Sequence, residues 1–171
     1  YGNVMGSRGS VVPYFRKLIE EGATYLPITH TEMTRFWISL EAGVKLVFNA
    51  FRRMHGGEVF VPKIPSIRIV DLAHAMGSDI KIKVVGIRPG EKLHEVMCPA
   101  DDAHLTYDFS DHYVIRPTIA CWGEDVDFSI NKLQEQGRLV SPGFEYNSGS
   151  NPHFLTINEL KALHRMQKVP A

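Results

Sequence analysis

Tyr1-Gly2-Asn3-Val4, followed by Gly6-Ser7-Arg8-Gly9-Ser10 and an apolar helical repeat, is the stretch that indicates the fold class of this 171-residue chain. The first four residues have the character of the end of a buried strand, and the glycine- and serine-rich segment after them is typical of a turn. Over 11–21 the apolar residues recur every three or four positions, which predicts an amphipathic helix. Ser10 is a suitable N-cap and Gly22 marks the exit. A strand that leads through a turn into a helix is typical of an α/β fold.

The rest of the chain mixes short helical and extended patterns. Apolar spacings of three and four predict helices, whereas alternating apolar and polar residues predict half-buried strands. Helices are expected at 40–54, 69–76, 91–97 and after the capping box Thr156-Ile157-Asn158-Glu159, and strands at 25–28, 58–62, 81–87 and 112–115. Between 99 and 150 the patterns are otherwise weak. Together, these patterns predict a mixed α/β fold built from short helices and strands.

Charge and hydropathy exclude several classes of protein. Lys plus Arg and Asp plus Glu both number 19, so the formal net charge is zero. A nucleic-acid-binding surface usually shows a basic excess, so we expect no nucleic-acid partner. The apolar stretches are too short to span a bilayer, and the N-terminus lacks the pattern of a signal peptide. We therefore expect no membrane association and a cytoplasmic location.

The metal-binding and redox residues form no motif. Cys98 and Cys121 are far apart in the sequence, which is typical of a reducing compartment, and both are expected to be small core residues. The eight histidines form no zinc-binding spacing. The sequence therefore predicts no metal site.

Complete catalytic motifs are also missing from the sequence. It contains no G-x-G-x-x-G turn for a dinucleotide, no Tyr-x-x-x-Lys pair and no G-x-S-x-G nucleophile motif. The chain begins with Tyr1, a strand-like residue, rather than with Met. We therefore expect a piece of a longer enzyme that binds a ligand but holds no complete chemical machinery.

Three segments nevertheless carry polar residues that suit a phosphorylated, sugar-bearing ligand. In the first, Asn3 ends a strand at the rim of a sheet, where ligands collect in α/β folds. The helix start at Ser10 and Val11 offers free backbone N–H groups to an anion. An ordinary asparagine turn with an N-cap would account for the same residues.

In the second segment, Arg35 is embedded among Phe36, Trp37 and Ile38. A buried guanidinium needs a partner, and phosphate suits its planar fork. An Arg–Glu pair or stacking on Trp37 would meet the same need.

In the third segment, a strand runs into Arg88-Pro89-Gly90-Glu91. An arginine for phosphate beside a carboxylate for ribose hydroxyls would make a nucleotide-diphosphate clamp. A plain strand–turn–helix with a helix-stabilising glutamate is the alternative. Lys63 is a further ligand candidate, although most such lysines are only solvated.

Five segments in the same order resemble one family of enzymes. They are Tyr1-Gly2-Asn3-Val4 with Gly6-Ser7-Arg8-Gly9-Ser10-Val11, Pro27-Ile28-Thr29-His30-Thr31-Glu32-Met33-Thr34-Arg35-Phe36-Trp37, Val61-Pro62-Lys63-Ile64-Pro65-Ser66, Gly86-Ile87-Arg88-Pro89-Gly90-Glu91-Lys92-Leu93-His94-Glu95 and Gly143-Phe144-Glu145-Tyr146-Asn147-Ser148-Gly149. They resemble the inverting UDP-N-acetylglucosamine 4,6-dehydratases of the extended short-chain dehydrogenase/reductase superfamily. The branch most similar is the one that opens the pseudaminic acid pathway for flagellin glycosylation.

The resemblance implies a role for most of the ligand candidates. Asn3 would hydrogen-bond the substrate diphosphate, Arg35 and Arg88 would hold its phosphates, and Glu91 would bind the uridine ribose. In such enzymes the helix start lies near the nucleotide. The substrate would be UDP-N-acetylglucosamine, and the parent enzyme is expected to be a homo-oligomer.

The resemblance also implies a cofactor, NADP, bound mainly by another part of the enzyme. Tyr1 and Val4 would border its nicotinamide end. The glycine-rich turn, the active-site tyrosine and lysine and the acid–base residues lie before Tyr1 in such enzymes. Carbon 4 of the sugar is oxidised there, water leaves from carbon 6, and carbon 5 is inverted.

The implied fold is the C-terminal portion of an extended short-chain dehydrogenase/reductase. Residues 1–22 would be the last strand and helix of a Rossmann-type core, 23–100 a smaller mixed α/β substrate domain, and 101–171 a C-terminal extension. The alternatives are the substrate part of a UDP-sugar 4-epimerase or of a retaining dehydratase, a non-catalytic nucleotide-sugar binding module, or an inert truncated product.

Overall fold

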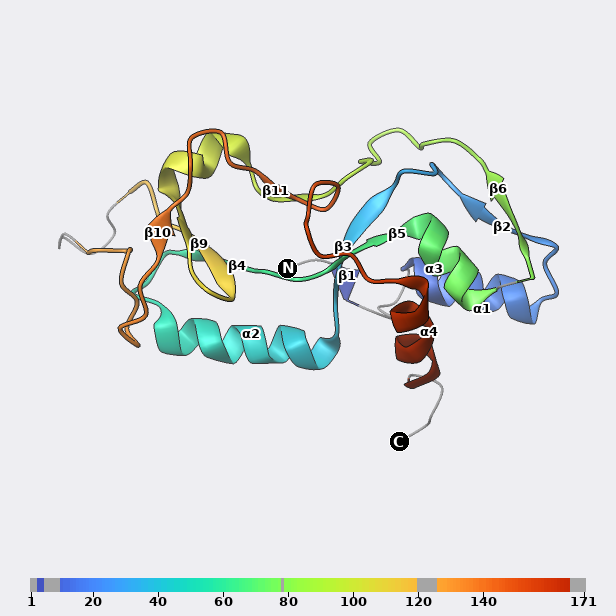
Figure 1. Cartoon of the computed structure of the whole chain (residues 1–171), viewed down its shortest axis with the longest axis horizontal. Coiled ribbons are helices and arrows are strands. Elements are labelled where there is room, and N and C mark those ends of the chain that lie inside the picture. Colours follow the sequence, from blue (N-terminus) through green and yellow to red (C-terminus); the bar gives the residue numbers. More distant parts are fainter. Residues whose placement is uncertain (1–2, 5–9, 78, 120–125, 167–171) are drawn as a thin grey trace. The chain divides into compact units, whose positions relative to one another are not determined.

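The computed structural model describes residues 3–4, 10–77, 79–119 and 126–166, so the predictions for Tyr1 and Cys121 lie outside it (Figure 1). Within this part the chain divides into two compact units. Of the described residues, unit 1 comprises 39–63, 96–119 and 126–147, and unit 2 comprises 3–4, 10–38, 64–77, 79–95 and 148–166. Each unit is described by itself. The domain boundaries expected from the resemblance stay a prediction.

The described residues of unit 2 form two small sheets and three packed helices. Its elements are β1 (Asn3–Val4), α1 (Val11–Glu20), β2 (Tyr25–Ile28), β3 (Thr34–Ile38), β5 (Ser66–Arg68), α3 (Ile69–Met76), β6 (Lys81–Val84) and α4 (Ile157–Met166). Strands β1 and β3 are parallel, β3 and β5 are antiparallel, and β2 pairs in parallel with β6. Parallel pairing combined with helices is characteristic of α/β architecture, as the sequence predicted.

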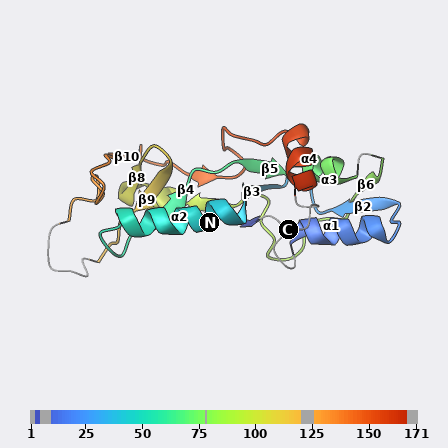
Figure 2. The ribbon, with the colours of Figure 1, turned by 90° about the horizontal axis from the view of Figure 1, so that it is seen from below.

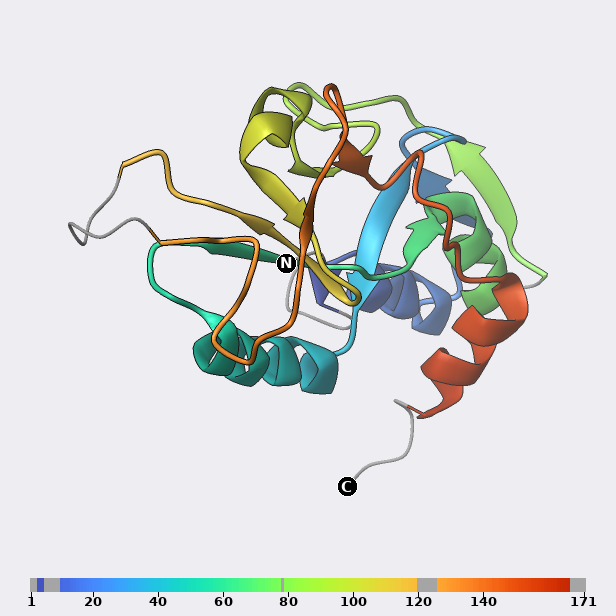
Figure 3. The ribbon, with the colours of Figure 1, turned by 60° about the vertical axis from the view of Figure 1, so that its left-hand side comes forward.

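One apolar core holds unit 2 together. Its buried members are Val12, Phe15, Leu26, Ile28, Met33, Trp37, Ile67, Ile69, Leu72, Ala73 and Leu160. Helix α3 contributes to this core and packs against α4, α1 and β2; Figure 3 shows α3 in green beside α4 in red, and Figure 2 shows α1 alongside β2. The core therefore fixes the start of α1 relative to the ends of β2 and β3.

Unit 1 is built around an antiparallel sheet. Its elements are α2 (Leu40–Arg53), β4 (Val59–Pro62), β7 (Val96–Cys98), the 3-10 helix η1 (Ala100–Leu105), β8 (Thr106–Asp108), β9 (His112–Ile115), β10 (Arg138–Leu139) and β11 (Tyr146–Asn147). The sheet order is β10-β8-β9-β4, and β11 pairs with β7. Cys98 is a buried free thiol, as predicted, and burial raises its pKa to about 12.

Local signals explain the helix boundaries. The Ser39 hydroxyl accepts a hydrogen bond from the Ala42 N–H at 3.1 Å and so caps α2. The predicted capping box of α4 is confirmed, because Thr156 N–H donates to Glu159 Oε2 at 2.8 Å and Glu159 N–H donates to Thr156 Oγ1 at 3.3 Å. Helix α1 ends before Gly22, whose φ of +76° suits a residue without a Cβ.

Two sequence-based predictions are wrong in detail. The helix expected at 91–97 does not form: the segment ends in β7, and the Leu93 carbonyl accepts from Thr34 N–H at 3.1 Å instead of from a helical neighbour. The strand expected over 81–87 ends at Val84. At 91–97, hydrogen bonds to residues distant in the sequence form in place of the helical hydrogen bonds.

Among the helices of the described residues, none is long and apolar enough to cross a membrane.

Candidate functional site

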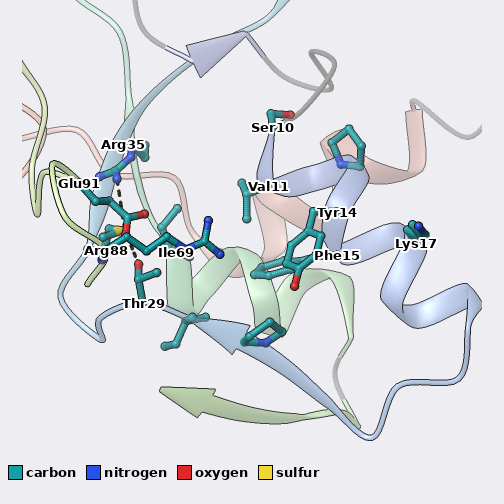
Figure 4. A pocket seen from close by; sticks show the side chains of 14 residues that line it. Ser10, Val11, Tyr14, Phe15, Lys17, Thr29, Arg35, Ile69, Arg88 and Glu91 are labelled. Atoms are coloured by element: carbon teal, nitrogen blue, oxygen red, sulfur yellow. Dashed lines mark hydrogen bonds between the residues drawn. The ribbon is translucent and has the colours of Figure 1, made fainter. Parts of the chain in front are cut away.

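A cavity of about 650 Å³ in unit 2 brings together most of the residues singled out from the sequence (Figure 4). Its lining residues are Ser10, Val11, Pro13, Tyr14, Phe15 and Lys17 from the start of α1, Pro27, Ile28 and Thr29 from the end of β2, Met33, Arg35, Ile69, Arg88 and Glu91. In Figure 4, Arg35, Arg88 and Glu91 gather on one side, and Ser10, Val11 and Tyr14 lie on the other. The cavity is thus cationic on one side and bordered by a helix start on the other.

Arg35 lies in β3 with only 15% of its side chain exposed. Its Nη1 group donates to the Thr34 carbonyl at 2.7 Å and to the Leu93 carbonyl at 3.2 Å. Its Nε lies 3.8 Å from Glu95 Oε1, so the Arg–Glu pair considered from the sequence is present. The Nη2 group donates to the Met33 sulfur at 3.3 Å, and a thioether is a weak acceptor. Nη2 is therefore the part of the guanidinium that a stronger acceptor would engage.

Arg88 and Glu91 form one tight turn. The Glu91 N–H donates to the Arg88 carbonyl at 3.0 Å, and the Arg88 N–H donates to Glu91 Oε2 at 3.1 Å. Between them Gly90 has a φ of +80°, in the left-handed region that favours glycine. Arg88 is exposed and Glu91 is half-buried. The turn holds a cation and a carboxylate beside each other at the cavity.

The start of α1 supplies a different kind of group. Ser10 occupies the N-cap position in extended conformation, as predicted, but its side chain makes no capping hydrogen bond. Its Oγ is buried and has no partner within the described part of the chain. A helix N-terminus with a spare hydroxyl favours an anion or a polar ligand atom.

Thr29 was missed by sequence reasoning. It follows β2 directly, and its hydroxyl donates to the Met33 sulfur at 3.0 Å. Thr29 and Arg35 therefore direct donors at the same weak acceptor, as the dashed lines in Figure 4 show. Its place at the end of a predicted strand was the signal that could have found it.

The remaining candidates lie elsewhere or have no described side chain. Lys63 belongs to unit 1, where its ammonium donates to the Asp108 carboxylate and the Phe109 carbonyl and lies 4.8 Å from the centre of the Tyr113 ring. Asn3 pairs with Trp37 in the sheet, and its side chain lies outside the described residues. Val4 is half-buried in β1.

The residues present do not by themselves fit a whole dinucleotide. Val4 offers an apolar contact in β1, but the sequence has no glycine-rich turn that would bring backbone amides to a pyrophosphate. No group of three potential metal ligands occurs among the described residues.

Comparisons with known proteins identify the family of this chain. The model of the family described as polysaccharide biosynthesis protein matches residues 1–117. The chain is 60% identical to the inverting UDP-N-acetylglucosamine 4,6-dehydratase of Campylobacter jejuni subsp. jejuni serotype O:2, over 94% of this chain and 48% of the relative. It is 38% identical to a UDP-glucose 4-epimerase of Rickettsia canadensis, over 95% of this chain and 47% of that protein.

Among solved structures, Pen from Bacillus thuringiensis superposes with a TM-score of 0.76 at 29% identity, covering 98% of this chain and 49% of that one. The chain spans about half the length of the curated relatives it matches. The resemblance to the inverting UDP-N-acetylglucosamine 4,6-dehydratases and the predicted α/β fold class are both confirmed. The chain therefore belongs to the polysaccharide biosynthesis protein family, within the extended short-chain dehydrogenases/reductases.

Proposed function

We propose that this chain binds the UDP group of UDP-N-acetylglucosamine within an inverting 4,6-dehydratase. One observation carries the proposal: Arg35, Arg88 and Glu91 line the same cavity as the start of α1. UDP combines a diphosphate with a ribose diol, and one side of the cavity offers two arginines and a carboxylate. The 60% identity to the Campylobacter jejuni dehydratase supports the same substrate class.

The diphosphate would be held by the two arginines. A phosphate oxygen is a far stronger acceptor than the sulfur that Arg35 Nη2 now contacts, so a phosphate would replace the contact to Met33. Thr29 donates to the same sulfur and would follow Arg35 to the same oxygen. Arg88 is exposed on its turn and can approach the second phosphate.

The ribose would be held by Glu91. A carboxylate accepts hydrogen bonds from two neighbouring hydroxyls, and the half-buried Glu91 is fixed by the bond from the Arg88 N–H. The buried Ser10 hydroxyl and the N–H groups near Val11 would face the nucleotide from the opposite side. Asn3 and Lys63 remain ligand candidates that rest on the sequence.

The contribution of this chain to the reaction would be binding and orientation. NADP would be held mainly by another part of the enzyme and would supply the hydride exchange; within this chain Tyr1 and Val4 are its proposed contacts. The reaction proceeds through several steps on one sugar, so a fixed UDP group keeps the reacting carbons in place. We further propose a 4-keto-6-deoxy product for pseudaminic acid and flagellin glycosylation, made by a cytoplasmic homo-oligomer.

A UDP-sugar 4-epimerase is the second candidate, because a Rickettsia canadensis 4-epimerase is 38% identical over 95% of this chain. Both reactions require the UDP group to be bound in the same way, so a measurement of UDP binding does not distinguish the two functions. Incubation of the whole enzyme that contains this chain with UDP-N-acetylglucosamine, followed by analysis of the product by mass, separates the two, since dehydration removes one water and epimerisation leaves the mass unchanged. This chain alone is expected to give no product, and turnover would refute the assignment of chemistry to another part of the enzyme.

Calorimetric titration of the chain with UDP tests the binding site. Arg35→Ala and Arg88→Ala should each weaken UDP binding by about 10- to 100-fold, the effect of losing one charge-assisted hydrogen bond. Arg138→Ala removes an equal charge from an exposed strand of unit 1 and should leave the affinity unchanged. Unchanged binding in both cavity variants would show that the arginines do not hold UDP.

A further inference from the structure

Ser148 joins two segments of unit 2 from a fully buried position. Its hydroxyl accepts a hydrogen bond from the Glu95 N–H at 2.9 Å and lies 2.7 Å from the Thr34 hydroxyl. Its own N–H donates to the Glu95 carbonyl at 2.8 Å. Ser148 therefore hydrogen-bonds both the N–H and the carbonyl of Glu95 and connects this residue to Thr34 in β3.

The segment that Ser148 holds also carries partners of Arg35. The Leu93 carbonyl accepts from Arg35 Nη1 at 3.2 Å, and Glu95 Oε1 lies 3.8 Å from Arg35 Nε. The other oxygen of Glu95, Oε2, accepts from the Phe36 N–H at 3.2 Å, which fixes the carboxylate. The position of residues 93–95 therefore sets the direction in which the guanidinium points.

His94 completes the connection behind the cavity. Its Nδ1 lies 2.8 Å from Thr34 Oγ1, the hydroxyl that also contacts Ser148. Thr34 is buried as well, so its bond with Ser148 is shielded from water. The result is a continuous hydrogen-bonded path from Ser148 to the residues on either side of Arg35.

We propose that Ser148 is a positioning residue for phosphate binding, which holds residues 93–95 so that Arg35 presents Nη2 to the cavity. The proposal rests on the proposed function, since it assigns a purpose to the conformation of Arg35. It also gives a role to the motif at 143–149, which contributes no lining residue to the cavity.

The test compares Ser148→Ala with Ser66→Ala by UDP titration and thermal unfolding. Ser66 is the matched control, because it is fully buried in the same unit and its hydroxyl accepts from Asn151 Nδ2 at 2.9 Å. Both variants should unfold at lower temperature, but only Ser148→Ala should weaken UDP binding, by roughly tenfold, the equivalent of one hydrogen bond. Equal losses in the two variants would overturn the proposal.

A double-mutant cycle with Arg35→Ala shows whether Ser148 acts through Arg35. Ser148→Ala should cost nothing further in the Arg35→Ala background, because no guanidinium is left to orient. A full loss in that background would overturn the proposal. If Ser148→Ala does not fold, Ser148→Cys keeps the size of the side chain and a weak hydrogen bond, and a smaller loss of affinity is expected. An unchanged affinity in Ser148→Cys would count against the proposal.

A readout without UDP separates this inference from the proposed function. The Arg35 Nε–H signal in a ¹H–¹⁵N spectrum, assigned by its absence in Arg35→Ala, should exchange with water faster in Ser148→Ala but not in Ser66→Ala. If exchange is faster in Ser148→Ala but the wild-type chain does not bind UDP, Ser148 positions Arg35 and the proposed ligand is wrong. If the wild-type chain binds UDP but exchange in Ser148→Ala is unaltered, the proposed ligand stands and the positioning role is wrong.

Discussion

Arg88 and Glu91 hydrogen-bond each other twice across one turn, through the Glu91 N–H to the Arg88 carbonyl at 3.0 Å and through the Arg88 N–H to Glu91 Oε2 at 3.1 Å. The carboxylate that is proposed to bind ribose therefore also shapes the turn that carries the arginine. A substitution at Glu91 has to separate these two effects. Glutamine does so, because its side-chain oxygen can still accept from the Arg88 N–H.

Glu91→Gln should weaken UDP binding by about tenfold, because a charged acceptor for the ribose hydroxyls becomes a neutral one. Binding of inorganic pyrophosphate should be unchanged or tighter, since a negative charge beside the phosphates is removed. Calorimetric titration measures both ligands. Glu20→Gln makes the same change at an exposed position at the end of α1 and should affect neither. Equal losses for UDP and pyrophosphate would contradict a ribose contact at Glu91.

His112 gives unit 1 a sensitivity to acid. The ring is fully buried between Phe60 and Phe109, at centroid distances of 5.4 and 4.8 Å. Burial lowers the pKa of His112 below its ordinary value of 6.5, although the hydrogen bond between Nδ1 and Asp111 at 2.7 Å opposes that shift. The protonated form is therefore favoured more in the unfolded chain than in the folded one.

The sign of the pH effect follows from this lowered pKa. Above pH 6.5 the imidazole is neutral in both states, and folding is independent of this group. As the pH falls below 6.5, the unfolded chain gains a proton first, so stability is lost until the folded pKa is reached. Arg53, which pairs with Asp111 and Glu135 near this ring, keeps its charge over that range.

His112→Phe should remove this loss, because phenylalanine retains the stacking and cannot take up a proton. Thermal unfolding between pH 7 and pH 5 measures the effect, with His104→Gln as the control at an exposed histidine. Between pH 7 and pH 5 the melting temperature of the wild-type chain and of the control should fall more steeply than that of His112→Phe. Parallel curves for all three would show that His112 does not titrate on unfolding.

Sequence patterns were sufficient where a segment is held by its own neighbours. The periodicity at 11–21 and 40–54 and the capping box at Thr156 correspond to observed helices. The Arg88 turn was found for the same reason, since its two bonds join residues three apart. These features depend on spacings that a single sequence displays.

Long-range pairing explains what the sequence did not reveal. Strand β3 has Phe36, Trp37 and Ile38 all buried, so the alternation that marks a half-buried strand is missing there. The expected helix at 91–97 does not form, because its backbone carbonyls accept hydrogen bonds from Thr34 and Ser148, which are far away along the chain. The bond between Thr34 and Ser148 spans 114 positions, and no local pattern indicates it. Arg35 could be singled out from the sequence, but the residues that orient it could not.

Lys63→Met should lower the free energy of unfolding of the chain by about 1 kcal/mol. The variant loses a partly exposed ion pair to Asp108 and a cation–π contact to Tyr113, and each is worth a fraction of that value. Urea unfolding measures the change, and Lys132→Met is the control at an exposed lysine of the same unit. UDP titration of the same variant decides whether Lys63 is also a ligand: a tenfold loss of affinity would support it, and an unchanged affinity would assign the lysine to unit 1 alone.

Two glycines should respond in opposite directions to the same substitution. A Cβ on Gly149 would lie 2.7 Å from both Cγ and Nδ1 of His94, so the ring would have to move away from its bond with Thr34. Gly43 lies inside α2 with no atom within 4 Å of an added Cβ. Gly149→Ala should therefore destabilise the chain and weaken UDP binding, whereas Gly43→Ala should stabilise it by about 0.5–1 kcal/mol without affecting UDP. Thermal unfolding and titration of both variants check this pair. If Gly149→Ala changes neither stability nor UDP affinity, the His94 ring can move without disturbing Thr34. The hydrogen bond between His94 and Thr34 would then not help to orient Arg35.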